Sequence, residues 1–259
     1  MSAAIFRFHT TLNDFLPKDK RQVRITVTFN GHETVKHLIE SLGVPHTEVD
    51  VILINGISVD FSNQLADGDR VDIYPGRETI DGIAIIRLQP IIFGEIRFVL
   101  DGHLGKLASY LRLLGFDTLY RNIYDDDELA EISQKDGRVL LTRDRGLLMR
   151  NQVRYGYWVR AKFPQKQVVE VLSRYNLADQ TQYFSRCARC NGYLNPVEKA
   201  DVFDRLELKT RLYYHEFRMC QQCNQIYWRG SHFERLEAKL KNFVELSNSA
   251  KGLDSHNYN

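Results

Sequence analysis

Apolar and polar residues alternate in several short stretches of the first part of the chain. Segments 5–9 (IFRFH) and 23–29 (VRITVTF) have the two-residue period of half-buried strands, and residues 34–43 have a helical period that ends at Gly43. Further strands are predicted in VILING, ISV and DRVDIYP, with a tight turn at Asn55–Gly56. The order of these elements predicts a small α+β unit in which a sheet packs on one helix.

From residue 97 onwards, short apolar runs alternate with segments of helical period. Strands are predicted in FVL, FDTLY, RVLLT and VRYGYWV. Helices are predicted at 104–114, from the acid cluster Asp125–Glu128 to Gly137, in RGLLMR, and at 164–176. This alternation predicts a parallel sheet with helices on its faces. Residues 78–95 between the two parts form a predicted linker with some strand character in IAIIRLQPIIFG.

The last part of the chain has a cysteine-containing segment, 187–223, followed by a predicted helix at 232–247. The polar end KGLDSHNYN is expected to be disordered. No repeat of solenoid period is found.

Composition and charge exclude few classes of protein. Of 259 residues, 43% are hydrophobic and 26% charged, as in ordinary globular proteins. The net charge of +2 excludes a global basic field but not local basic patches. No apolar run is long enough to cross a bilayer, and MSAAIFRFHT has no signal-peptide core, so a cytoplasmic location without membrane contact is expected.

Aspartates follow two of the predicted strands. Asp101 comes directly after FVL, Asp144 comes just after RVLLT, and the acid cluster Asp125–Glu128 lies between them. In open α/β sheets, ligands bind outside the carboxyl ends of the strands. Carboxylates that converge there can hold Mg²⁺ or Mn²⁺, and such ions drive phosphodiester hydrolysis. Nearby basic residues are candidates for contacts with phosphate oxygens: Lys106, Arg112, Arg143 and Arg145.

Each of these acids also has a plain structural interpretation. Asp101 and Asp144 can cap the helices that follow them, and the cluster can be a solvated helix start. Their joint placement at two strand ends favours metal binding. Other α/β chemistries are disfavoured because GxGxxG, GK[ST] and GxSxG motifs are absent.

All the cysteines of the chain lie in two CxxC pairs, Cys187/Cys190 and Cys220/Cys223. Four thiolates suit tetrahedral Zn²⁺, and a site closed by four cysteines is structural rather than catalytic. The intervening segment is longer than usual, and we expect it to loop out as a hairpin. A redox role is disfavoured because the pairs lack a thioredoxin-like strand–helix context.

Basic and aromatic residues surround these pairs and suit single-stranded RNA through base stacking and phosphate contact. Arg229 and His232 are the candidate RNA contacts. The tyrosines can equally fill the small core of a zinc ribbon, and the pattern does not decide between the two.

Residues 52–75, ILINGISVDFSNQLADGDRVDIYP, resemble the last strands of the ubiquitin-like β-grasp family of sulfur carriers. Working carriers end in an activated diglycine tail. Here Pro75–Gly76–Arg77 continues into more protein, so the resemblance implies a docking or binding domain.

Four features together resemble the PIN-like family named for the C-terminal ribonuclease domain of the Mut-seven exonuclease. They are the segments DGHLGKLASYLRLLGFDTLY and DDDELAEISQKDGRVLLTRDRGLL, the paired cysteines, and YWRGSHFER. The resemblance covers residues 97–236 and implies a metal-dependent ribonuclease with a zinc ribbon. It assigns the catalytic acids to Asp101, Asp126 and Asp144, with Asp127 as substitute for the middle one. Two departures are that Gly102–His103 follows the first acid and that a fourth acid has no clear candidate.

The resulting expectation is an α/β protein with a PIN-like parallel sheet, an N-terminal β-grasp domain and a C-terminal zinc ribbon. The predicted boundaries are 1–77 for the β-grasp domain, 78–95 for the linker, 96–180 for the nuclease domain, 181–236 for the ribbon and 237–259 for the helix and tail. Structural Zn and catalytic Mg or Mn are the expected cofactors. Single-stranded or structured RNA such as tRNA or rRNA is the expected partner, with a protein partner possible at the β-grasp domain. The alternatives are an inactive RNA- or ribosome-binding factor and a protein-interaction adaptor.

Overall fold

The computed structural model describes residues 1–76, 84–92 and 94–254. The chain forms two compact units, one made of Met1–Glu95 with Asp125–Trp158 and the other of Ile96–Tyr124 with Val159–Asn259. Among the described residues, no helix combines the length and the apolar composition required to span a bilayer.

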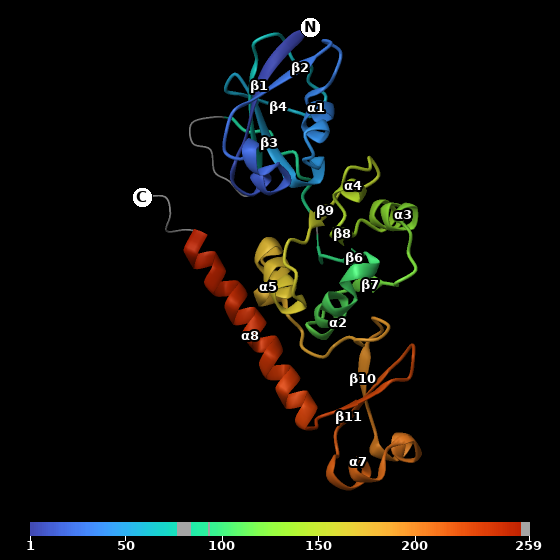
Figure 1. The fold of residues 1–259 in the computed structure, drawn as a ribbon. Helices are drawn as coiled ribbons and strands as arrows, with labels where there is room; N and C mark the ends of the chain where they lie inside the picture. The colour runs from blue at the N-terminus through green and yellow to red at the C-terminus, as the bar shows by residue number, and fades with distance from the viewer. Residues whose placement is uncertain (77–83, 93, 255–259) are drawn as a thin grey trace. The chain divides into compact units, whose positions relative to one another are not determined.

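The first 76 residues form the predicted α+β unit (Figure 1). Its elements are β1 (Ser2–Phe8), β2 (Ile25–Phe29), α1 (Val35–Ser41), β3 (Val49–Ile54), β4 (Ile57–Val59) and β5 (Arg70–Pro75). The strands lie in the order β2-β1-β5-β3-β4, with β1 and β5 parallel and the other pairs antiparallel. The strands and the helix predicted from the hydrophobic pattern are therefore confirmed.

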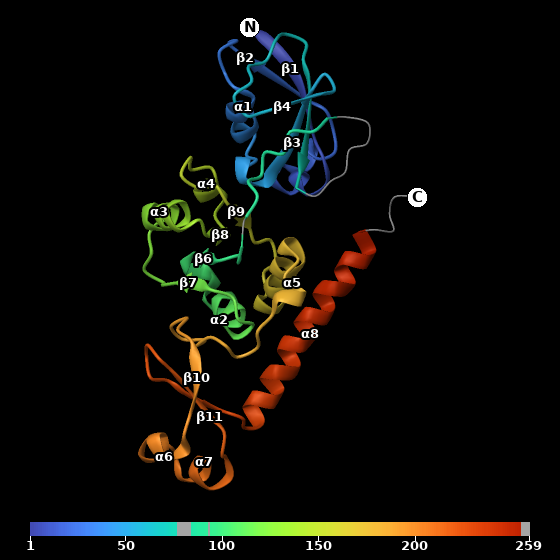
Figure 2. The same cartoon turned by 180° about the vertical axis from the view of Figure 1, so that it is seen from behind.

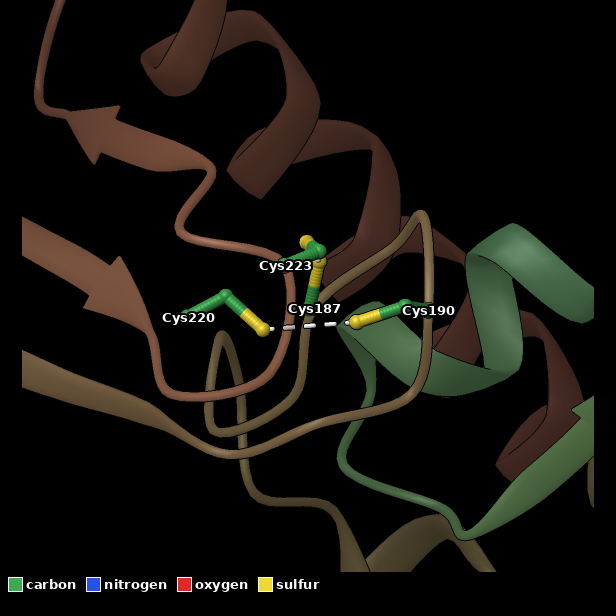
Figure 3. A group of neighbouring side chains, drawn as sticks. All are labelled: Cys187, Cys190, Cys220 and Cys223. Carbon is green, nitrogen blue, oxygen red and sulfur yellow. Dashed lines mark hydrogen bonds between the residues drawn. The ribbon is translucent and has the colours of Figure 1, made fainter.

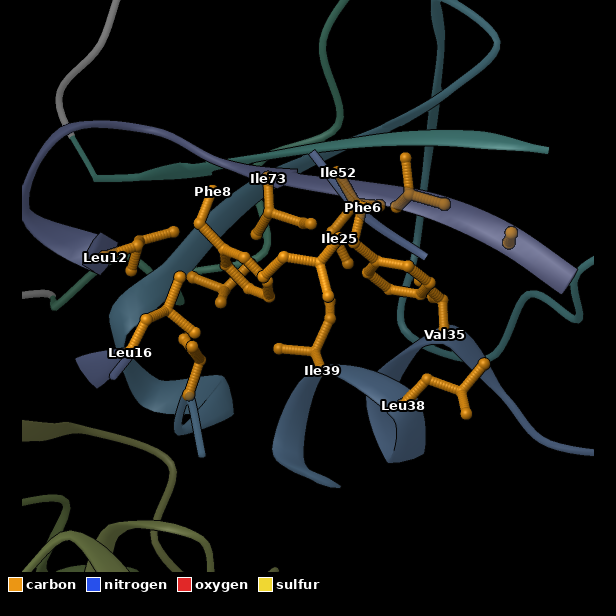
Figure 4. Packing of buried hydrophobic residues seen from close by; sticks show 14 of the residues in the cluster. Phe6, Phe8, Leu12, Leu16, Ile25, Val35, Leu38, Ile39, Ile52 and Ile73 are labelled. Carbon is orange, nitrogen blue, oxygen red and sulfur yellow. The ribbon is translucent and has the colours of Figure 1, made fainter. Parts of the chain in front are cut away.

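The core of this unit follows from the alternation along its strands. Phe6 and Phe8 on β1 are buried, whereas Arg7 between them is exposed. Their rings pack with Ile39 of α1 and Ile73 of β5 in one apolar cluster (Figure 4).

The described part of the predicted linker lies along this sheet. The Arg87 guanidinium donates to the Asp50 carboxylate at 2.6 Å, and the Leu88 amide donates to the Asp50 carbonyl at 2.8 Å. Residues 84–92 contain no strand, so the expected strand character is wrong there. Ile83 and Phe93, which also belong to that expected stretch, lie outside the described residues.

The central region has the predicted alternation of strands and helices. Its elements are β6 (Phe98–Leu100), α2 (Gly105–Leu113), β7 (Thr118–Tyr120), α3 (Asp126–Asp136), β8 (Val139–Thr142), α4 (Arg145–Leu148), β9 (Gly156–Trp158) and α5 (Pro164–Tyr175). The sheet has the order β7-β6-β8-β9, and the β6–β7 and β8–β9 pairs are parallel. Every residue of β6 and β8 is buried, as expected for strands covered on both faces.

The cysteine segment forms a three-stranded antiparallel sheet of β10 (Leu194–Val197), β11 (Phe217–Cys220) and β12 (Ile226–Trp228). Strands β10 and β11 pair as the expected hairpin. The excursion between them carries two short helices, α6 (Lys199–Val202) and α7 (Leu208–Tyr213) (Figure 2). Val202 of α6 and Leu206, which lies between the two helices, pack on Phe217 and Ile226 of the sheet.

The last helix, α8, spans Ser231–Asp254 and lies beside α5 in both views (Figures 1 and 2). Leu240 and Phe243 of α8 are buried, and the Ser173 hydroxyl of α5 donates to the Ser247 carbonyl at 3.2 Å. The helix continues beyond the predicted end, so the expected disorder is wrong for residues 251–254. A formed helix gains one hydrogen bond for each added residue, which favours this extension. Residues 255–259 lie outside the described residues.

Candidate functional site

The four cysteines meet at one point (Figure 3). Their sulfur atoms all lie within 4.8 Å of one another. Cys187 Sγ is 3.6 Å from Cys223 Sγ, and Cys190 Sγ is 3.3 Å from Cys220 Sγ. Tetrahedral zinc with bonds of ~2.3 Å requires sulfur separations of roughly 3.8 Å. The cysteines therefore fit a closed four-thiolate metal site.

The two CxxC pairs form matching knuckles. Asn191 and Asn224, each directly after the second cysteine of its pair, have positive φ angles of 75° and 55°. The Asn191 amide donates to the Cys187 carbonyl at 2.9 Å, and the Asn224 amide donates to the Cys220 carbonyl at 3.0 Å. Asparagine tolerates this left-handed conformation better than most residues. The repeated CxxCN sequence is a signal of this symmetry that sequence reasoning missed.

The site includes a hydroxyl beside its first thiol. Tyr227 Oη lies 3.1 Å from Cys187 Sγ. Burial opposes ionisation of Cys187, but hydrogen bonds from Tyr227 and from backbone amides outweigh it and lower the pKa of this thiol to about 7. Burial also raises the pKa of Tyr227, so its hydroxyl stays protonated and available as a donor. If Cys187 binds a metal, a donor at this distance would orient its sulfur and moderate its charge.

Arg112, expected to contact phosphate, is buried with 4% exposure. Its guanidinium donates to the carbonyls of Thr118, Ala188 and Arg189 at 2.9, 3.1 and 3.0 Å. These donors hold the first knuckle against α2 and β7, and the expected phosphate contact of Arg112 stays a prediction. Only contacts between residues far apart in the chain could have revealed this role.

Asn191 makes a second link between the knuckle and β7. Its Oδ1 accepts the Thr118 amide at 3.0 Å, and its Nδ2 donates to the Asp117 carboxylate at 2.8 Å. Since β7 is an edge strand, this side chain satisfies a backbone group that the sheet leaves unpaired.

The acids at the strand ends both act as helix caps. Asp101 is buried, and its Oδ1 accepts the His103 amide at 2.8 Å. Asp144 is exposed, and its Oδ1 accepts the Gly146 amide at 2.7 Å. Each of these bonds occupies one oxygen, and a carboxylate has about four lone-pair sites, so capping is compatible with metal binding.

The four acids at the start of α3 have two different roles: two cap the helix, and two form ion pairs. Asp125 and Glu128 form a capping box, in which each side chain accepts from the other residue's amide at 2.8 and 3.0 Å. Asp126 lies 3.7 Å from the Arg150 guanidinium, and Asp127 makes a closer ion pair with the same group. Sequence reasoning missed Arg150, which only the turn after α4 brings to this helix.

The expected metal site of Asp101, Asp126 and Asp144 stays a prediction. Asp101 belongs to one compact unit, and the two other acids belong to the other unit. In the part of the chain that the structure describes, the cysteine quartet is the one group of three or more His, Cys, Asp or Glu residues whose ligand atoms lie close enough for a shared ion.

The remaining expected phosphate contacts differ in their surroundings. Lys106 on α2 and Arg143 before α4 are exposed. Arg145 is not exposed in this way, because its guanidinium stacks 4.0 Å from the Trp158 ring and donates to the Phe15 carbonyl at 2.9 Å. These contacts give Arg145 a structural role, and a phosphate contact at Arg145 stays a prediction.

A cavity of about 460 Å³ lies beside the three-stranded sheet and the start of α8. Arg229, one of the expected RNA contacts, lines it, and its guanidinium lies 5.4 Å from the Phe233 ring. His232 is exposed on the first turn of α8. The aromatic and basic lining residues are Tyr183, Phe184, His215, Phe217, Arg218, Tyr227, Trp228, Arg229 and Phe233. Tyr214, in contrast, packs in the ribbon core.

The chain thus combines a β-grasp domain, an α/β region with a parallel sheet, and a ribbon whose four cysteines could bind a structural metal. Comparison with protein-family models identifies the first part, residues 1–81, as a Mut7-C ubiquitin domain, and residues 96–240 as a Mut7-C RNAse domain. The chain belongs to the Mut7-C RNAse domain family, which confirms the resemblance found in its motifs. A comparison with curated proteins gives no match.

Proposed function

We propose that this protein is a metal-dependent ribonuclease whose metal-binding acids are Asp101, Asp126 and Asp144, with Asp127 as the substitute for the middle acid. The match of residues 96–240 to the Mut7-C RNAse domain carries this proposal. Asp101 directly follows β6, and Asp144 lies two positions beyond Thr142 at the end of β8, where ligands of α/β sheets bind.

Three carboxylates are a donor set that Mg²⁺ and Mn²⁺ prefer. A bound ion of this kind would supply an activated water and stabilise the leaving oxygen of a phosphodiester. Lys106 and Arg143 then orient the phosphate through charge-assisted hydrogen bonds, because both are exposed. The cysteine knuckles act separately, since we propose that they bind zinc and fix the ribbon.

We also propose that the ribbon grips unpaired RNA at its cavity. Aromatic rings such as Trp228, which is 39% exposed, provide stacking surfaces, and Arg229 at the same cavity can contact phosphate. His232 on the neighbouring turn extends this basic edge. The combination supports single-stranded RNA rather than a duplex, since only unstacked bases enter such a cavity.

Cleavage of an unstructured RNA in Mn²⁺ tests the proposal. Asp101→Asn and Asp144→Asn keep the size and the capping oxygen of each side chain, and we expect both to abolish cleavage while RNA binding is retained. Glu131→Gln is the matched control, because Glu131 is exposed on α3 away from its first turn.

The two alternatives predict different outcomes of the same experiment. If the wild-type protein binds RNA but cleaves none in Mn²⁺ or Mg²⁺, it is an RNA-binding factor without activity. If it has no affinity for RNA and loses a protein partner when residues 1–77 are deleted, it is an adaptor that works through the β-grasp domain.

A further inference from the structure

Arg145 fastens the turn of Asp144 to the β-grasp domain. Its guanidinium carbon lies 4.0 Å from the Trp158 ring centre and 5.2 Å from that of Phe15, whose rings are themselves 4.9 Å apart. The guanidinium also donates to the Phe15 carbonyl at 2.9 Å and to the Asp14 carbonyl at 3.2 Å. We call Phe15, Arg145 and Trp158 the Arg145 cluster.

Residues of β9 and of the turn before it make further contacts with the β-grasp domain. The Trp158 amide donates to the buried Glu48 carboxylate at 2.7 Å, and the Trp158 side chain packs against the β-grasp core. The His46 ring donates to the Val153 carbonyl at 3.1 Å. The segment 145–158 is thus attached to the β-grasp domain at several points within one compact unit.

Both neighbours of Asp144 take part in this attachment. The Trp158 indole donates to the Arg143 carbonyl at 3.3 Å. The Arg145 guanidinium is held by the Phe15 ring and by the Phe15 and Asp14 carbonyls of the β-grasp domain. Asp144 itself is fixed within the turn, since its amide donates to Thr142 Oγ1 at 2.9 Å and its carboxylate accepts the Gly146 amide at 2.7 Å. The result is an exposed carboxylate on a turn that is held on both sides.

We infer that the β-grasp domain is a structural part of the nuclease site, and that Arg145 is a positioning residue which fixes the orientation of Asp144. This inference rests on the proposed function, in which Asp144 binds the catalytic metal. Arginine suits the role because its planar fork can stack on two rings and donate to two carbonyls at once. Catalytic geometry is sensitive to such support, since a displacement of about 1 Å can cost about 100-fold in rate.

The test compares full-length Arg145→Ala, Arg145→Lys and Phe15→Leu with the wild type. We expect Arg145→Ala to lower kcat about 10- to 100-fold and to change the KM for RNA by less than about twofold. Arg145→Lys should not restore kcat, because an ammonium group has neither the plane nor the fork. Lys36→Ala is the matched control, because Lys36 contacts Asn151 on the same interface at 2.7 Å but does not contact the turn of Asp144.

A second measurement does not depend on cleavage. Amide hydrogen exchange at Gly146 and Leu147 should become faster in Arg145→Ala and Phe15→Leu and stay unchanged in Lys36→Ala. Thermal unfolding of each variant identifies any loss of the whole fold, and Arg145→Lys and Phe15→Leu provide milder changes if Arg145→Ala does not fold.

Three results would overturn the inference. One is wild-type kcat and exchange in all the cluster variants. Another is a raised KM with unchanged kcat in Arg145→Ala, which would make Arg145 an RNA ligand. The third is equal loss of kcat in Lys36→Ala, which would mean that the whole interface acts only through stability. If the wild type cleaves nothing, the proposed function fails instead, and the exchange experiment still decides whether the cluster holds the turn.

Discussion

At the scale of single residues, arginine is the side chain whose role depends most on partners distant in the chain. Arg145 adjoins the proposed catalytic acid Asp144, Arg112 lies on the helix that follows Asp101, and both are expected from the sequence to contact phosphate. Each instead donates to backbone carbonyls, Arg112 across to residues 188 and 189 and Arg145 across to residues 14 and 15. Lys106 and Arg143 stay as the exposed candidates near the acids.

Arg112→Leu should destabilise the protein strongly. The change leaves three carbonyls without the donors they have now, and each hydrogen bond to a charged group contributes about 1.5–3 kcal/mol. We expect the free energy of unfolding to fall by about 3 kcal/mol or more in denaturant titrations. Lys106→Ala on the same helix should change it by less than about 0.5 kcal/mol and should weaken RNA binding instead. A stable Arg112→Leu variant with weakened RNA binding would restore the phosphate contact that the sequence suggested.

At the scale of elements, the three proposed catalytic aspartates all stand at the starts of helices. Four successive acids open α3, and their roles differ although the sequence presents them as equivalent. Asp125 and Glu128 satisfy backbone donors of the helix, whereas Asp126 and Asp127 face Arg150. Stability and proposed catalysis can therefore be separated within one turn.

Asp125→Ala should cost about 1 kcal/mol of stability, because the N-cap bond of the capping box is lost. Its rate of RNA cleavage should stay at the wild-type value once the protein is folded. Asp126→Asn should do the opposite, with stability within about 0.5 kcal/mol and cleavage lost. Thermal unfolding and cleavage assays on the two variants measure both quantities. If cleavage is lost in Asp127→Asn and retained in Asp126→Asn, the second metal-binding acid is Asp127 instead of Asp126.

The elements themselves were largely predictable, because hydrophobic period and helix caps are local features. The strands of the β-grasp unit, the ends of α3 and α5 at Gly137 and Asn176, and the cysteine pairs all follow from short stretches of sequence. The helices α6 and α7 were missed, since their four- and six-residue lengths are too short for a clear period. Side-chain roles such as those of Arg145 and Asn191 depend on tertiary contacts, which no local pattern contains.

At the scale of the whole molecule, the near balance of charge means that affinity for RNA must come from local surfaces rather than a global field. The cavity of the ribbon is one such surface, and the exposed basic residues Lys106 and Arg143 near the proposed catalytic acids form another. The ribbon depends on its knuckles, because the apolar cluster between its sheet and α6 is small.

Removal of the proposed zinc should therefore unfold the ribbon and leave the β-grasp core folded. We expect one zinc ion per chain by elemental analysis, and after chelation the ribbon's share of the unfolding signal should be lost while the transition of the β-grasp core remains. Zinc affinity should rise with pH, because each thiol must lose its proton to bind. Cys223→Ser should reproduce the effect of chelation. A chelated protein with an unchanged unfolding profile would show that the ribbon is held by packing alone.

The interleaving of the two compact units has a consequence for the order in which the chain can fold during synthesis. The unit that begins with the β-grasp domain also needs residues Asp125–Trp158, which are made only after the first stretch of the other unit. At about 5–20 residues per second, the ribosome delivers Trp158 several seconds after Glu95. During this interval the surface of the nascent β-grasp domain that later meets Arg145 and Trp158 has no partner from its own chain. The contacts of the Arg145 cluster can therefore form only late in synthesis, after the β-grasp strands are already complete.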